Sequence, residues 1–365
     1  MNLMYFILSK ACDAFTKQRG FSDEKLYDSG NLYHSVEFAQ YDYLQLGQYE
    51  KAQEMLSRMD SIISKLDGAK WNKTRDFIWI QQRMAARQKL ETFGKCLKPE
   101  PEPESEHETV VPEDEFPITD GNMNYAAISE LGLLLDRLLQ GIKLNSSCGE
   151  KMVDRAMKQT KKLIKNLESR KSLFEYIKNT ALMMHQLMTG IRDFAKNTKN
   201  TGAFKKATDI QKQHMVQSSA TPTLLYMPSY EIYGYVLLVR KEYEEALEMF
   251  EASLVERMGR TLSLLGLARA HSMLGNREQA SYFYQYLQTQ LQKADEENLA
   301  AKEAESWGSS SKSRIAVEKI RDTWFWPYYL PFQPADKGER RCSKANKKDE
   351  KTKRRKIPRW KSWEG

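Results

Sequence analysis

The sequence predicts an all-α protein, an α-solenoid of antiparallel helix hairpins, and three observations indicate this fold class. Apolar residues recur at helical spacing through most of the 365 residues, with glycine or asparagine between the segments. No run of Val, Ile and Thr alternates with polar residues over a useful length, so strands are not expected. In the C-terminal half, similar residues recur 34 positions apart, and such a period is typical of stacked helical repeats.

The helices are expected in order along the chain, and many are joined by only two or three residues, which favours antiparallel hairpins. The expected ranges are 2–18, 32–46, 49–66, 74–93, 122–143, 150–168, 171–197, 203–217, 228–240, 242–257, 260–274, 276–294 and part of 296–322. The first range is apolar on most sides. It either packs into the end of the solenoid or presents an open edge to another chain or to upstream repeats.

Composition divides the chain into five parts. We expect N-terminal helical hairpins over 1–96, an acidic Pro-rich linker over 97–120, a helical region over 121–322, an aromatic segment over 323–336 and a basic tail over 337–365. The length is ample for a large core. The net charge of +8 is distributed unevenly among these parts.

The strongly charged segments are the linker and two basic regions. Residues 99–120 carry nine acids, five prolines and no base, so the linker is expected to be extended or disordered. Docking of this segment on the basic helices that follow it is the alternative. Residues 150–212 and 337–365 each carry a net charge of +9. The tail has almost no aliphatic residues and is also expected to be disordered.

A period of 34 residues links two helix pairs over about 228–290. The recurring positions are Tyr230 and Leu264, Gly234 and Ala268, Ala246 and Ala280, and Phe250 and Tyr284. The small residues let the two helices of a pair approach closely. The aromatic residues, four positions after the alanine on the same face, fill the space between neighbouring hairpins. Tyr243 begins the second helix of the first pair, and Gly275 suits the tight turn of the second pair.

An earlier stretch, FAQYDYLQLGQYEKAQEMLSRM, has residues at the spacings that a helix–turn–helix unit needs. These residues are Tyr43, Gly47, Tyr49, Ala52 and Leu56. The small residue expected on the first helix is missing, because Gln40 occupies that position.

These residues resemble the tetratricopeptide repeat. The resemblance covers two tandem units over about 228–290 and one further unit over about 33–60, and it is weaker over 121–217. The phrases YHSVEFAQYDYLQLGQYEKA and MPSYEIYGYVLLVRKEYEEALEMFEASL, followed by SLLGLARA, resemble a widespread group of uncharacterised tetratricopeptide-repeat proteins. Members of that group usually carry more repeats upstream, so a shortened version is one interpretation of this chain. No established activity comes with the resemblance.

A repeat array of this kind implies a superhelix with a concave groove, lined by the first helix of each pair. The side chains that helical geometry places in the groove are Glu231, Tyr235, Ser263, Arg269 and His271. We therefore expect a non-catalytic interaction scaffold that holds a protein or peptide partner in this groove. Glu231 and Tyr235 stand where repeats that bind chaperone C-termini carry Lys and Asn, which argues against that clamp.

Signatures of catalysis, cofactor binding and metal binding are missing from the sequence. There is no GxSxG, GxGxxG, GxxxxGK[ST] or HExxH motif, and the four cysteines stand far apart. His185 lies on an apolar face, where a role in the core is expected. We expect no enzyme activity, no cofactor and no metal ion.

Two C-terminal segments offer alternatives to the groove. The aromatic segment contains Trp324, Phe325, Trp326, Tyr328, Tyr329 and Phe332. It either wraps onto the last helices or anchors a partner. The basic residues of the tail are Lys347, Lys348, Lys351, Lys353, Arg354, Arg355 and Lys356. This run is typical of nuclear-import or polyanion-binding patches. Together with the basic helices over 150–212, it makes nucleic-acid binding the alternative function.

The expected location is the cytoplasm. No run of about 18 apolar residues indicates a transmembrane helix, and the first residues lack the features of a signal peptide. Widely separated cysteines suit a reducing compartment. The basic tail makes the nucleus the alternative location.

Overall fold

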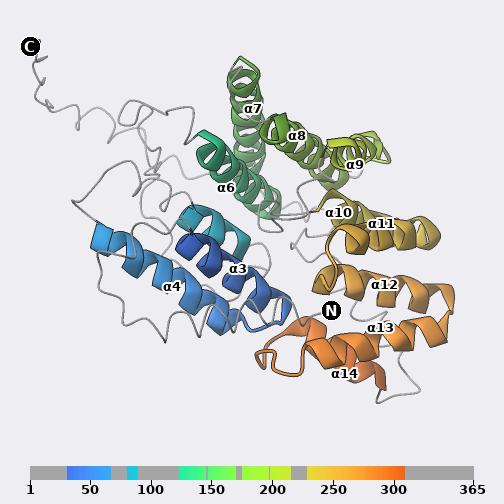
Figure 1. The fold of residues 1–365 in the computed structure, drawn as a ribbon. Helices are drawn as coiled ribbons and strands as arrows, with labels where there is room; N and C mark the ends of the chain where they lie inside the picture. The colour runs from blue at the N-terminus through green and yellow to red at the C-terminus, as the bar shows by residue number, and fades with distance from the viewer. Residues whose placement is uncertain are drawn as a thin grey trace, which may run out of the picture.

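The computed structural model describes residues 31–66, 80–88, 123–144, 147–169, 175–196, 198–214 and 228–308. Every regular element in these ranges is a helix (Figure 1), which confirms the predicted all-α class. The expected helix over 2–18, the acidic linker, the aromatic segment and the basic tail, including Lys347 to Lys356, lie outside the described residues.

The helices fall close to the predicted ranges. They are α3 (Asn31–Gln45), α4 (Tyr49–Leu66), α6 (Met123–Leu144), α7 (Ser147–Glu168), α8 (Glu175–Ala195), α9 (Gly202–His214), α10 (Ser229–Arg240), α11 (Tyr243–Glu256), α12 (Thr261–Leu274), α13 (Arg277–Gln290) and α14 (Leu299–Gly308). A further short helix spans residues 80–88. The clearest difference is at α13, which ends at Gln290 rather than near residue 294.

The loop between α13 and α14 is held by a contact with a distant turn. The Asp295 N–H donates to the Gly47 carbonyl over 3.0 Å, which ties the loop to the α3–α4 turn. The Asn298 side chain then accepts a hydrogen bond from the Ala301 N–H at 2.9 Å, as a helix N-cap does, and α14 starts there. A contact between residues 248 positions apart thus positions the loop that follows α13.

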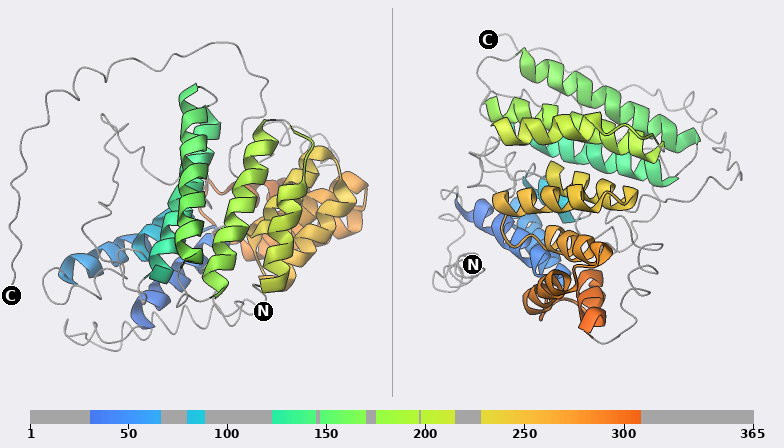
Figure 2. Two further views of the ribbon diagram at one scale, coloured as in Figure 1. Left: turned by 90° about the horizontal axis from the view of Figure 1, so that it is seen from above. Right: turned by 90° about the vertical axis from the view of Figure 1, so that its right-hand side faces the viewer.

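Consecutive helices pack as antiparallel pairs, as predicted. α6 packs with α7, α8 with α9, α10 with α11 and α12 with α13, and α14 packs on α13. The pairs follow one another in an arc (Figure 1), and the turned views keep the same order (Figure 2). α3, α4 and the helix 80–88 lie on the inner side of the arc. This arrangement is consistent with a helical repeat.

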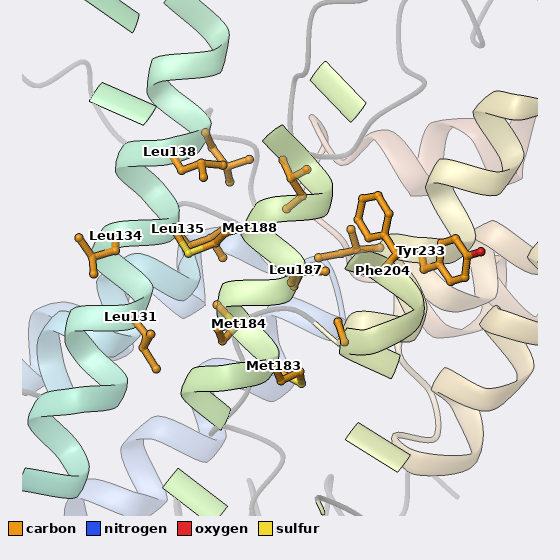
Figure 3. Close-up of a cluster of buried hydrophobic side chains, with 14 of the residues drawn as sticks. Leu131, Leu134, Leu135, Leu138, Met183, Met184, Leu187, Met188, Phe204 and Tyr233 are labelled. Carbon is orange, nitrogen blue, oxygen red and sulfur yellow. The ribbon is translucent and has the colours of Figure 1, made fainter. Parts of the chain in front are cut away.

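The largest hydrophobic cluster runs from α6 to α12. Figure 3 shows leucines of α6 facing the methionines of α8, with Phe204 of α9 and Tyr233 of α10 on the other side of α8. Met183, Met184 and Met188 are fully buried, so these flexible side chains fill gaps in the core. The rings of Phe204 and Tyr233 stack with their centroids 5.6 Å apart, and they join the α8–α9 pair to the α10–α11 pair.

The Phe250 ring of α11 lies in a narrow slot between α10 and α12. A Cβ atom added at Gly234 would lie 2.8 Å from the ring, and one added at Gly266 would lie 2.3 Å from it. Tyr235 meets the same ring edge-on at 5.0 Å. The ring therefore fits only because α10 and α12 each present a bare glycine to it. Ala246, one turn earlier on α11, is also fully buried.

The next hairpin repeats this packing with a polar addition. Ala268, Ala280 and Tyr284 are fully buried. The Tyr284 ring stacks on Trp307 of α14 at 4.6 Å, and its hydroxyl donates to the Glu303 carboxylate at 2.9 Å. Tyr284 thus occupies the position of Phe250, and its hydroxyl group finds a partner on the following helix.

The remaining residues of the predicted repeat units lie at the end of α12, beside the largest cluster and in the α3–α4 hairpin. Gly275 has φ +81° at the end of α12, and Tyr243 packs against the large cluster. In the earlier unit Ala52 and Leu56 are buried, and Tyr43 and Tyr49 are half-buried.

The close packing of Phe250 against Gly266 predicts that the effect of Gly266→Ala on stability changes sign when the Phe250 ring is removed. Gly266→Ala should destabilise the protein by about 1–3 kcal/mol, because its methyl group collides with the Phe250 ring. In a Phe250→Leu background the same change should stabilise it by up to about 1 kcal/mol, because alanine favours the helix. Urea unfolding followed by far-UV circular dichroism measures both effects. A stabilising Gly266→Ala in the parent protein would contradict this packing.

Candidate functional site

The candidate groove residues on α10 and α12 form a buried polar network. The Glu231 carboxylate accepts hydrogen bonds from Arg260 Nε at 2.7 Å and Arg260 Nη2 at 2.8 Å. The Ser263 hydroxyl donates to the same carboxylate at 2.6 Å and also lies 2.8 Å from the Ser253 hydroxyl. All four side chains are buried. A bidentate pair with an added hydroxyl satisfies both charges inside the protein.

Tyr235 is also an interior residue. Its hydroxyl donates to the Leu262 carbonyl at 2.7 Å, and its ring is fully buried. Burial raises the pKa of Tyr235 well above its ordinary value. The hydrogen bond joins the middle of α10 to the start of α12, close to the Phe250 slot.

Arg269 and His271 occupy different surroundings, nearer the surface. Arg269 donates to Glu303 of α14 through Nε at 2.9 Å and Nη2 at 2.6 Å, and its side chain is 12% exposed. The half-buried His271 ring stacks on Phe283 of α13 at 5.6 Å, and burial lowers the pKa of His271. Arg269 thus contacts α14, and His271 contacts α13.

The structure therefore does not place the five candidates together on an open groove. Glu231, Tyr235 and Ser263 have no solvent-exposed area, so they cannot meet a partner without unfolding. The physical reason is that ten consecutive residues of α10 and nine of the first ten residues of α12 are buried, so these parts of the two helices are covered on every side. Their polar side chains bind one another instead.

The α3–α4 turn is the part of the N-terminal hairpin that reaches the C-terminal pairs. The Gln45 side-chain oxygen accepts from the Thr261 N–H at 3.0 Å, and the Gln45 carbonyl accepts from Gln290 Nε2 at 3.0 Å. Gly47 has φ +69°, and a Cβ there would lie 2.3 Å from Asn298 Nδ2. Thr261 begins α12, Gln290 ends α13 and Asn298 directly precedes α14. The turn is thus fitted closely to the inner edge of the array.

A second buried ionic network holds α3 to the helix 80–88, and sequence reasoning missed it. Glu37 accepts hydrogen bonds from Arg83 at 2.7 Å and from Arg87 at 3.0 Å, and all three side chains are buried. Although burial alone would raise it, the two guanidinium groups lower the pKa of Glu37. Gln40, which stands where a small residue was expected, donates to the Met84 carbonyl at 3.0 Å. The spacing of Arg83 and Arg87, four residues apart on one helix face, is the sequence signal that could have predicted this network.

Large apolar side chains reach solvent mainly on the second helices of the hairpins. We call α7, α9, α11 and α13 the outer helices. Among the described residues, the exposed large hydrophobic side chains are Leu133 (38%), Val255 (83%), Met258 (58%), Tyr282 (59%) and Tyr286 (36%). Four of these five lie on α11, on the turn that follows it, or on α13. Tyr282 and Tyr286 are four residues apart on α13 and share a face, and apolar side chains that gather on one face mark interaction surfaces more often than isolated residues do.

The described ranges contain neither a cluster of metal ligands nor a membrane span. Within them, no three or more His, Cys, Asp or Glu side chains are arranged to hold a metal ion. None of the helices in these ranges combines the length and apolar character needed to cross a bilayer. Comparison with known protein families, with curated proteins and with solved structures gives no match to the chain.

The buried Glu231–Arg260 pair predicts a large and non-additive loss of stability. Arg260→Met should cost about 3–5 kcal/mol, because it leaves the Glu231 carboxylate buried without its counter-charge. The double variant Glu231→Leu with Arg260→Met should cost much less than the sum of the single changes. Urea unfolding of the three variants gives the coupling energy. Additive single costs below about 1 kcal/mol would show that the pair is solvated.

Asp42 of α3 predicts a pH dependence of stability. Burial raises the pKa of the Asp42 carboxyl from 3.8 to about 7. The folded state therefore holds this proton more tightly than the unfolded chain, so stability is full near pH 4 and falls as the pH rises through 7. Asp42→Asn should abolish this fall and be more stable than the parent at pH 8.5 by about 1–4 kcal/mol.

The measurement for Asp42 is urea unfolding at pH 4, 5.5, 7 and 8.5. Glu54→Gln is the control, because Glu54 is exposed on α4 and should leave the pH profile unchanged. An Asp42→Asn variant whose advantage is equal at all four pH values would rule out this carboxyl as the source.

Proposed function

We propose that the protein is a non-catalytic interaction scaffold, built from hairpins like those of the tetratricopeptide repeat, that binds a protein partner through the outer surface of α11 and α13. The observation that carries the proposal is the concentration of exposed large apolar side chains there, with Val255 83% and Tyr282 59% exposed. A packed array that leaves such side chains in water is best explained by a partner that covers them.

The repeat assignment is supported by the burial of equivalent residues. Ala246 and Ala280, 34 positions apart, are both fully buried, and so are Phe250 and Tyr284. The same offset of 34 makes the exposed Tyr282 of α13 equivalent in position to the exposed Glu248 of α11. Helices of the outer layer thus share one packing face and differ on the face that meets solvent, as binding repeats do.

The aromatic side chains of α13 are held in place before any partner arrives. Tyr282 meets Phe283 edge-on at 5.2 Å, and Phe283 stacks on His271 of α12. Tyr286 lies one helical turn after Tyr282, on the same face. Tyrosine supplies contact area at a low cost in conformational entropy, because its side chain has few rotatable bonds, and tyrosine is enriched among residues that dominate binding.

The outer surface is preferred over the concave groove for a physical reason. Glu231 and Arg260 satisfy each other inside the protein, and opening that site would separate a buried ion pair. A partner that lies on α11 and α13 leaves this network intact. The proposed interaction therefore uses the face where the array has unsatisfied apolar area.

The proposal predicts that one pair of substitutions removes the captured partners. Tyr282→Ser with Tyr286→Ser should reduce the capture of specific partners by about tenfold or more, the effect expected for loss of binding hot spots. Glu244→Ser with Glu248→Ser is the matched control, because both residues are exposed on α11 with the same spacing. Quantitative affinity capture with mass spectrometry compares the three chains. Circular dichroism and Tm verify that both variants are folded, and an unchanged set of partners for the tyrosine variant would contradict the proposal.

A further inference from the structure

The exposed face of α7 carries a row of basic side chains. Every side chain in the row is exposed: Lys151, Arg155, Lys158, Lys162 and Lys165. Their spacings alternate between four and three residues, so at about 100° per residue they lie within an arc of about 80°. The buried residues Val153, Met157, Thr160 and Ile164 lie on the opposite side of the helix. We call this row the α7 basic face.

The acidic residues of α7 stand outside this face. Glu150, Asp154 and Glu168 are exposed but lie beside the arc rather than in it. The face is about 21 Å long, given a rise of about 1.5 Å per residue. Like charges three and four residues apart destabilise a helix, and Asp154, four residues before Lys158, and Glu168, three residues after Lys165, offset part of that cost. An anionic partner lying along the row would add to this compensation.

The composition of α7 favours an acidic peptide over a single-stranded nucleic acid as this partner. The 22 residues of the helix contain no aromatic side chain. Proteins that bind single strands usually stack bases on aromatic rings along a basic groove. An extended acidic peptide needs only carboxylates at intervals along the row, and about seven extended residues span its length.

The chain itself contains such a peptide, and in the sequence it ends shortly before α6, the helix that pairs with α7. Residues 99–120 carry nine acids and no base, and α6 begins at Met123, three residues later. α6 and α7 have 22 residues each and pack antiparallel, so the start of α6 and the end of α7 lie toward the same end of the pair. Lys162 and Lys165 lie in the last two turns of α7, nearest to that point, and Lys158 lies at the middle of the helix. Tethering at this distance gives a high effective concentration.

We propose that the α7 basic face is a docking site for the acidic segment 99–120 of the same chain. The contact is electrostatic and carried by several lysine–carboxylate pairs, each weak by itself. It screens the basic face from other anions at low ionic strength and weakens as salt is added. The proposal is independent of the surface on α11 and α13, which lies on other hairpins.

Lysine acylation rates, read residue by residue by mass spectrometry on the intact chain, test this proposal. At low salt, Lys158, Lys162 and Lys165 should react about three- to fivefold more slowly than in 0.5 M NaCl. Lys205, Lys206 and Lys212 are exposed on α9 and serve as internal references that salt should hardly change. Rates that are independent of protein concentration indicate docking within one chain.

Two variants with equal charge changes separate docking from a general field effect. The segment variant carries Glu108→Gln, Glu113→Gln, Asp114→Asn and Glu115→Gln. The control carries Glu244→Gln, Glu245→Gln, Glu248→Gln and Glu251→Gln, four exposed acids of α11. Only the segment variant should raise the three α7 rates to the high-salt values.

Three results would overturn the proposal. The first is equal acceleration in both variants, and the second is protection that disappears on dilution, which indicates contact between chains. The third is full reactivity of the α7 lysines at low salt with protection only after duplex RNA is added, which would assign the face to nucleic acid.

Discussion

The placement of the Phe250 ring between Gly234 and Gly266 is the constraint on which the C-terminal array depends. The ring separates α10 from α12 by the thickness of one aromatic side chain, and neither helix has a Cβ atom there to hold the other away. That approach brings Glu231 within reach of Arg260, and Tyr235 within reach of the Leu262 carbonyl. The polar network of the inner helices is therefore a consequence of how closely the two hairpins stack.

Close stacking determines which surfaces remain for binding. α10 and the first ten residues of α12 are buried almost throughout, and the α3–α4 turn fits against the start of α12 and the loop before α14 through Gln45 and Gly47. Where an open concave groove was expected along α10 and α12, the structure has an interior with the ion pairs Glu231–Arg260 and Arg269–Glu303. The surfaces left in water are the outer helices, with apolar side chains on α11 and α13 and basic side chains on α7. These differ in chemistry and lie on separate hairpins, so each suits a different kind of contact.

Much of the helical architecture could be predicted from the sequence, because periodicity and turn residues are local signals. The 34-residue period identified Phe250 and Tyr284, and both are buried where neighbouring helices meet. The orientation of Glu231 could not be predicted, since it depends on Arg260, which precedes the next helix in a turn. The contact of Gln45 with Thr261 joins residues 216 positions apart, and no local pattern encodes it. Helical geometry gives the face of a residue but not what covers that face.

Amide hydrogen exchange on the intact chain tests most directly whether α10 and α12 are interior helices. The account predicts that amides of residues 231–238 and 262–270 exchange more slowly than those of α13, and only through global unfolding. Exchange of α10 at the rate of the exposed outer helices, under conditions where the protein stays folded, would contradict it. The inner face would then be open to a partner.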